Sequence, residues 1–172
     1  LGIIHRDLGN YNKSKELLEK SLSVYKDISK KNTTDSAWIM ALLGTVYTKL
    51  GQYEQAKSLF EKSLKIYKNN FGNKHHKTAW VLGNIGIIYK EQKKYEKAMI
   101  LFEKTLRIFT ANCNETQDYI CWNLLHLGSV YGELGNYIKA KELIEKSLIL
   151  HEKTHGKSHI KTAKVLKEIG NI

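Results

Sequence analysis

The chain repeats itself every 42 residues, and this period limits its fold more than any other feature. A glycine-tyrosine turn phrase at Gly9-Asn10-Tyr11 returns as Gly51-Gln52-Tyr53 and Gly135-Asn136-Tyr137, and Tyr95 stands at the intervening position. A second series in the same register is Gly2, Gly44, Gly86, Gly128 and Gly170. A constant period of this size predicts stacked supersecondary units, each of which buries its apolar face on its neighbours. Such arrays usually bind other molecules.

Each repeat contains two apolar stripes with helical spacing. In residues 78–119, Leu82, Ile85 and Tyr89 follow one helical face, and a second stripe begins at Tyr95. The short segment between the stripes carries a glycine in most repeats, which suits a left-handed helix end. We therefore expect antiparallel helix pairs. The first helix of a pair, helix A, is expected near 35–50, 77–92 and 118–134, and the second, helix B, near 11–28, 53–69, 95–111 and 137–154.

Glycine recurs in the middle of each expected helix A, where it costs about 1 kcal/mol relative to alanine. Close approach of helix B would offset this cost. Alanines on helix B are the expected small partners, and larger residues would fill the next layer. The glycines are Gly44, Gly86 and Gly128, and the alanines are Ala56, Ala98 and Ala140.

This pattern resembles the tetratricopeptide repeat (TPR), in which a Leu-Gly pair and an aromatic on helix A precede an alanine and an aromatic on helix B. One copy reads Leu43-Gly44, Tyr47, Ala56 and Phe60. The period is longer than usual, and the phrase Gly72-Asn73-Lys74-His75 is similar to the kinesin-light-chain type of the repeat. The resemblance implies an all-α, right-handed superhelical solenoid whose A helices line a concave groove.

The resemblance extends over residues 1–172, which we interpret as a single TPR array of about four repeats. Leu1 matches Leu43 and Ile172 matches Ile88, so the chain starts and stops inside a repeat. We expect a partial helix A at each end and a longer parent protein.

The A-helix positions that point away from the core stripe are the candidate partner-binding residues. All three tryptophans occupy one such position, which would bring their indoles into a ladder along neighbouring helices. Tryptophan is favoured in binding hot spots, but it also packs well between helices, so both interpretations stay open. The candidates are Trp38, Leu42, Thr45, Trp80, Asn84, Ile87, Trp122, His126, Ser129 and Lys164.

The formal charge of +11 raises the possibility of nucleic-acid binding. Nearly all of it is lysine, spread along helices among glutamates, with the expected pairs Glu61–Lys65 and Glu103–Arg107. Arg6 and Arg107 are the only arginines. We therefore expect solvated helix faces and no nucleic-acid partner. The two cysteines, Cys113 and Cys121, favour thiols in a reducing compartment, and no run is apolar enough for a membrane span. A cytoplasmic location follows as an expectation.

One motif has catalytic spacing. His151-Glu152-Lys153-Thr154-His155 spells H-E-x-x-H, which on a helix can hold zinc, and His159 follows. However, His151 occupies the position of Tyr25, Tyr67 and Phe109, which indicates a packing role. No Ser-His-Asp grouping or phosphate loop is visible. We expect no enzyme activity, no cofactor and no metal site.

The sequence therefore predicts a protein–protein interaction scaffold that binds a peptide or helix in the concave groove. An alternative is a structural module that stacks end to end through apolar faces around Leu1, Ile4 and Leu8, and around Val165 and Ile169. Nucleic-acid binding is a third and weaker alternative.

Overall fold

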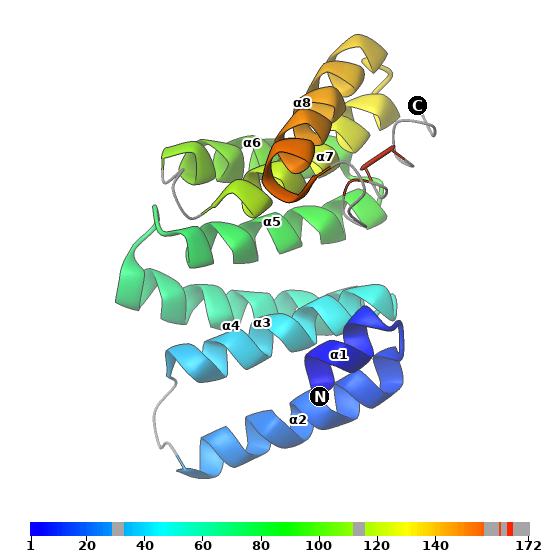
Figure 1. The fold of residues 1–172 in the computed structure, drawn as a ribbon. Helices are drawn as coiled ribbons and strands as arrows, with labels where there is room; N and C mark the ends of the chain where they lie inside the picture. The colour runs from blue at the N-terminus through cyan, green and yellow to red at the C-terminus, as the bar shows by residue number, and fades with distance from the viewer. Residues whose placement is uncertain (29–32, 112–115, 157–161, 163–164, 167–172) are drawn as a thin grey trace. The chain divides into compact units, whose positions relative to one another are not determined.

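The fold consists of paired helices (Figure 1). A computed structural model describes residues 1–28, 33–111, 116–156, 162, 165 and 166. The helices are α1 (Gly2–Asp7), α2 (Tyr11–Ile28), α3 (Thr34–Lys49), α4 (Tyr53–Phe71), α5 (His76–Glu91), α6 (Tyr95–Ala111), α7 (Gln117–Glu133) and α8 (Tyr137–His155). The all-α prediction is confirmed. Most of the expected partial helix after residue 160 lies outside the described residues.

The chain forms two compact units, residues 1–84 and 85–172, whose boundary falls inside α5. In the first unit, α1 packs on α2, and α3 packs on both α2 and α4. In the second unit, α7 packs on both α6 and α8. The A helices α3 and α7 thus each contact their own helix B and the helix B before it. That arrangement is the nearest-neighbour packing expected of a repeat protein. The single array over residues 1–172 stays a prediction.

The turns inside each pair share one backbone geometry. In the turn that joins α3 to α4, the N–H of Gly51 donates to the carbonyl of Thr48, and the N–H of Gln52 donates to the carbonyl of Tyr47. This is a Schellman motif, which needs a left-handed residue after the helix end. Gly51 has a φ of +73°, and Lys93 takes the same position with a φ of 57°. This turn position therefore requires a left-handed backbone conformation, which glycine adopts freely and which Lys93 adopts at a steric cost.

The junction phrase between pairs is also explained by hydrogen bonding. The hydroxyl of Thr78 donates to the carbonyl of Gly72 at 2.9 Å. The hydroxyl of Thr162 donates to the carbonyl of Gly156 at the same distance, two repeats later. Both glycines end a helix B with a positive φ, +81° and +88°. The Gly-to-Thr bond thus closes the loop that leads into the next helix A.

The mid-helix glycines lie against helix B, as expected, but the group that approaches them is a large side chain. A Cβ placed on Gly44 would lie 2.8 Å from Cε1 and Cζ of Phe60. The corresponding distances from Gly86 to Phe102 are 3.2 Å. The expected role of Ala56 and Ala98 as the small partners of these glycines stays a prediction. The aromatic ring itself fills the space that a side chain on the glycine would occupy.

Large buried side chains form the core of each unit. Phe60 and Tyr67 are almost fully buried in the first unit, and Phe102 and Phe109 are fully buried in the second. Burial of one such side chain stabilises the fold by about 1.5–3 kcal/mol. One core position is anomalous: Asn123 is fully buried, and its Oδ1 has no hydrogen-bond partner. Its amide nitrogen donates to the hydroxyl of Thr105.

Candidate functional site

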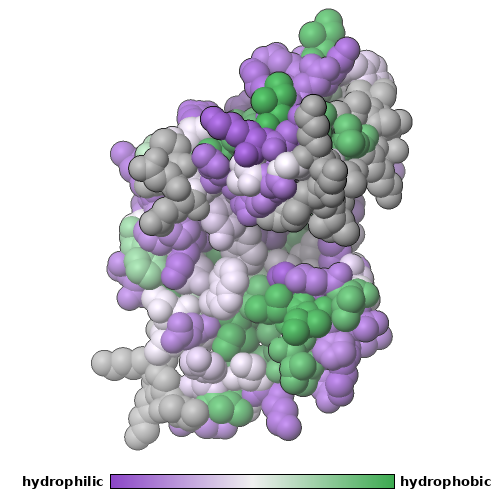
Figure 2. Space-filling model, in the orientation of Figure 1, coloured by the Kyte–Doolittle hydropathy of each residue, from purple (hydrophilic) through white to green (hydrophobic). Residues whose placement is uncertain are grey.

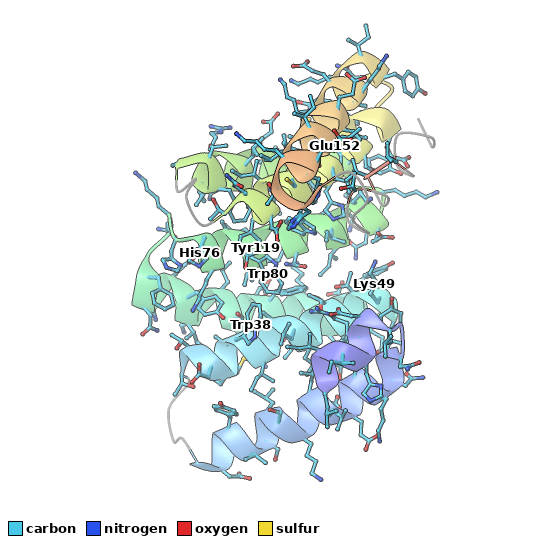
Figure 3. All side chains as sticks on the ribbon, viewed as in Figure 1. Trp38, Lys49, His76, Trp80, Tyr119 and Glu152 are labelled. Carbon is cyan, nitrogen blue, oxygen red and sulfur yellow. The ribbon has the colours of Figure 1, made fainter. Side chains whose placement is uncertain are left out.

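The first unit presents a pair of tryptophans from two successive A helices. Trp38 on α3 and Trp80 on α5 have ring centroids 5.0 Å apart, with the planes tilted by 41° (Figure 3). Trp38 is 37% exposed, and Trp80 is half-buried. The pair thus combines both interpretations of the sequence, because the indoles pack on each other while Trp38 keeps much of its surface open to solvent. The expected adjacency of these two tryptophans is confirmed.

Two of the candidate contact residues beside this pair are buried. Leu42 is 3% exposed and Asn84 is 6% exposed, so neither offers a free side chain. Asn84 donates its amide to the carbonyl of Trp80 at 2.8 Å and supports the helix that carries that indole. The prediction that these two positions point away from the core was wrong, because an A helix contacts neighbours on more than one side. Its outer positions are therefore covered as well. Thr45 is half-buried, and its hydroxyl donates to the carbonyl of Leu42 at 2.7 Å.

In the second unit, Trp122 packs against the hydrophobic core of that unit. Its ring lies 4.9 Å from His126 and 6.2 Å from Phe102, edge-on to both. His126 also stacks on Phe102, with centroids 5.6 Å apart. Trp122 and His126 are each half-buried, so one side of this group remains accessible. The indole here is therefore more a core residue than Trp38 is.

The remaining candidates have separate positions. Ile87 is half-buried and packs against the core of the second unit. The hydroxyl of Ser129 accepts from the amine of Lys90 at 3.3 Å. Lys164 lies outside the described residues.

Tyrosine hydroxyls on the A helices bind glutamates of the preceding helix B. Tyr47 donates to Glu19 at 2.6 Å, and Tyr131 donates to Glu103 at 2.8 Å. Burial, followed by the hydrogen bond and the charge of Glu19, raises the pKa of Tyr47 to about 12. The amine of Lys139 lies 4.6 Å from the centre of the Tyr131 ring. These contacts join successive helices, and they give some of the surface lysines and glutamates a role in packing.

Ion pairs along the helices account for further charge. Arg107 and Glu103 form the expected pair at 3.9 Å, and Lys146 and Glu142 form another at 2.5 Å. The expected pair between Glu61 and Lys65 is not among the ion pairs of the described residues. These pairs are exposed, and each contributes little to stability.

The histidines of the H-E-x-x-H motif lie at the end of α8. His151 is buried, as its position in the repeat predicts. Nε2 of His155 lies 2.5 Å from Oδ1 of Asp118 on α7, a neighbour that sequence reasoning missed. No local signal could identify Asp118, because the contact depends on the packing of α7 against α8. His159 lies outside the described residues.

The cysteine at the start of α7 has a packing role. Cys121 is buried, and its carbonyl accepts the hydroxyl of Ser147 at 2.9 Å. Alanines fill the equivalent positions of the two preceding repeats, Ala37 and Ala79, and both are buried as well. Cys113 lies outside the described residues. Within the part of the chain that the structure describes, no helix is long and apolar enough to cross a membrane.

These observations define a class, that of α-solenoids built from antiparallel helix pairs. The tetratricopeptide-repeat family model matches residues 1–69, 35–111 and 119–172, and the chain belongs to that family. No curated protein matches the chain.

Solved structures with this fold include kinesin-light-chain-like proteins, as the junction phrase predicted. BtubC (BKLC) from P. vanneervenii is 21% identical, with a TM-score of 0.77 over 99% of this chain and 68% of that chain. A Podosopora anserina kinesin-light-chain-type protein of nearly identical TPR-like repeats is 18% identical, with a TM-score of 0.72 over 99% of this chain and 81% of that chain. The N-terminal domain of stress-induced protein-1 (STI-1) from C. elegans is 17% identical, with a TM-score of 0.55 over 81% and 98% of the two chains. At these identities the likeness concerns the fold.

Proposed function

We propose that this chain is a protein-binding module that receives a peptide or helix of a partner on the surface formed by its A helices. The tryptophan pair of the first unit, in which Trp38 is exposed and Trp80 half-buried, is the observation that carries the proposal. TPR repeats generally mediate protein–protein interactions, and a binding role agrees with that family property. We propose binding and not catalysis, in a cytoplasmic setting.

The Trp38–Trp80 pair has the physical properties of a hot spot. Two indoles held against each other lose little further side-chain entropy when a partner arrives, which lowers the cost of association. The exposed face of Trp38 offers apolar area, and covering it excludes water from a neighbouring half-buried indole. Thr45 lies on the same helix and supplies a polar edge. Leu42 and Asn84 would act from beneath by holding these side chains in place.

Accessible residues of the second unit would extend the contact surface if the partner is long enough to reach both units. Trp122 and His126 form a mixed aromatic group with one accessible side, and Ile87 and Ser129 lie on the A helices beside it. Lys164 completes the proposed set.

The test is a peptide-display selection against the purified chain. Selected peptides are measured by isothermal titration against wild type, Trp38→Ala and Trp80→Ala. We expect each alanine variant to lose about 2 kcal/mol, or about 30-fold in affinity. Tyr137→Ala is the matched control, since Tyr137 is an aromatic residue 61% exposed on α8.

Melting curves of the same variants separate binding from packing. A modest decrease in melting temperature with a large loss of affinity supports the proposal. Collapse of the fold in Trp38→Ala, or equal losses of affinity in Trp38→Ala and Tyr137→Ala, would refute it.

Self-association is a second candidate function, favoured by one of the two apolar faces expected from the sequence. The other expected face is not supported, since Val165 is buried and Ile169 lies outside the described residues. Figure 2 shows apolar side chains gathered over α1 and adjoining parts of the first unit. Leu1, Ile4 and Leu8 are 84%, 57% and 69% exposed. Sedimentation velocity over a range of concentrations tests this, and Ile4→Lys should abolish any concentration dependence that arises from this face.

A further inference from the structure

Three side chains that can ligate a metal gather where the start of α7 meets the end of α8. One ligand atom from each of Asp118, His151 and His155 lies within 4.8 Å of the other two. The rings of His151 and His155 have centroids 5.8 Å apart. No other three His, Cys, Asp or Glu side chains of the described residues come together in this way.

The fold explains why these residues meet. His151 and His155 are four residues apart on α8 and therefore share a helical face. Because α7 and α8 are antiparallel, the first turn of α7 lies beside the last turn of α8, and this brings Asp118 to the two histidines. The hydroxyl of Thr154 reaches Oε1 of Gln117 at 3.3 Å and joins the same two helix ends. His151 is 6% exposed and is held firmly by its surroundings.

We propose that Asp118, His151 and His155 form a binding site for a divalent transition-metal ion, with zinc as the best fit. Two imidazoles and one carboxylate are a common ligand set for zinc, and water would take the fourth position. Ligand bonds of about 2.0–2.2 Å in a tetrahedron place ligand atoms about 3.3–3.5 Å apart. The closest pair, at 2.5 Å, must therefore open by about 1 Å, and a pair at the outer limit of 4.8 Å must close by about 1.4 Å.

The exposure of the residues permits this adjustment. The side chain of Asp118 is 49% exposed and that of His155 is 20% exposed, so both can rotate toward an ion. The more deeply buried His151 would stay in place and act as the anchor. An ion held in this way would connect α7 to α8 and stabilise the pair.

The glutamate of the H-E-x-x-H motif does not contribute to the ligand group. Glu152, labelled on α8 in Figure 3, directly follows His151 and so lies about 100° around the helix from it. It is not part of the ligand group. The motif spacing therefore provides two ligands, whereas the third comes from α7 and not from the motif.

The experiment titrates the chain, first stripped of metal with a chelator, with two metal salts. Zinc chloride binding is measured by calorimetry and by thermal melting, and cobalt chloride binding is measured by visible absorption. We expect one ion per chain and a rise in melting temperature of about 5–10 °C at a hundred-fold excess over the dissociation constant. The intensity of the cobalt bands reports a four-coordinate environment. His155→Ala and Asp118→Asn should each lose at least ten-fold in affinity.

His151→Phe gives a variant that should fold, because phenylalanine occupies the same position of the preceding repeat at Phe109. It should abolish the cobalt spectrum while leaving the circular dichroism unchanged. The matched control is the double variant His75→Ala, His76→Ala, which removes a neighbouring pair with ring centroids 4.2 Å apart at another junction. The proposal is overturned if zinc leaves the melting temperature of wild type unchanged, if His151→Phe binds as wild type does, or if the control loses as much affinity.

Discussion

Substitution of Gly44 by alanine tests the close helix packing that defines each repeat. The added methyl group would lie 2.8 Å from two atoms of the Phe60 ring, whereas carbon atoms normally approach to about 3.5–4.0 Å. Phe60 is fully buried and has no room to withdraw. Overpacking of this kind costs about 1–3 kcal/mol, and alanine returns about 1 kcal/mol through its higher helix propensity. We expect a net loss of about 1 kcal/mol in the free energy of unfolding.

Two equivalent glycines provide graded comparisons within the same chain. A methyl on Gly86 would lie 3.2 Å from the Phe102 ring, which a small shift can accommodate. Gly86→Ala should therefore stay within about 0.5 kcal/mol of wild type. A methyl on Gly128 would lie 2.5 Å from Cγ1 of Ile144 and 3.1 Å from the carbonyl oxygen of Ala140. Backbone cannot move cheaply, so Gly128→Ala should be the most damaging, at about 2 kcal/mol or more.

The assay is urea denaturation followed by circular dichroism, with midpoints compared among variants of equal slope. A double-mutant cycle with Phe60→Leu isolates the contact, because the penalty of Gly44→Ala should shrink once the ring is removed. If Gly44→Ala is as stable as wild type, or if its penalty is the same in both backgrounds, the steric argument is refuted.

Three further predictions concern single positions. Lys93→Gly should raise stability by about 0.5 kcal/mol, because Lys93 holds a φ of 57° where glycine carries no steric cost; a lower urea midpoint would contradict this. Asn123→Val should raise the free energy of unfolding by about 1 kcal/mol, and with it the melting temperature, since Asn123 is buried with an unpaired Oδ1. Val81 fills the equivalent position of the preceding repeat. A lower melting temperature would show that the amide is needed. The pKa of Tyr47 is raised to about 12 by burial and Glu19, so the folded chain keeps this proton above pH 10 and loses the associated stability as the pH rises toward 12. Ultraviolet titration should show late phenolate ionisation that includes Tyr95 and Tyr119, because a hydrogen bond to Glu133 raises the pKa of Tyr95 and burial raises that of Tyr119. Tyr47→Phe should remove one phenolate from this late phase, and an unchanged titration would refute the assignment.

The fold was predictable because its signals are local and repeated. Turn glycines such as Gly51 mark the ends of helix A, and the apolar stripe that resumes at Tyr53 marks the start of helix B. The predicted helix boundaries agree with the structure to within two residues, for example 53–69 against Tyr53–Phe71. The period supplied the pairing of helices, which propensity alone cannot provide.

The candidate site was less predictable, since it depends on contacts between helices. A helical wheel placed Leu42 and Asn84 on the outer face of α3 and α5, but neighbouring elements cover them. It also could not predict that Phe60 would reach Gly44, because side-chain direction determines which residue of helix B covers a gap. Asp118 was missed for a similar reason, since only the packing of α7 on α8 brings it to His155.

Comparison of the repeats distinguishes positions that hold the same residue in several copies from positions whose residue changes from copy to copy. The tryptophan position is filled by the same residue in three copies, but its contacts differ: Trp38 packs on Trp80, whereas Trp122 packs on His126 and Phe102. A tryptophan shared by the copies can supply affinity but cannot by itself distinguish one partner from another. Discrimination has to come from positions that change between repeats, such as Lys49, which is exposed at the end of α3 where Glu133 stands at the end of α7. A partner that runs along α3 from Trp38 would thus meet a positive charge at Lys49, about 16 Å further along the helix, which favours an acidic group at that end.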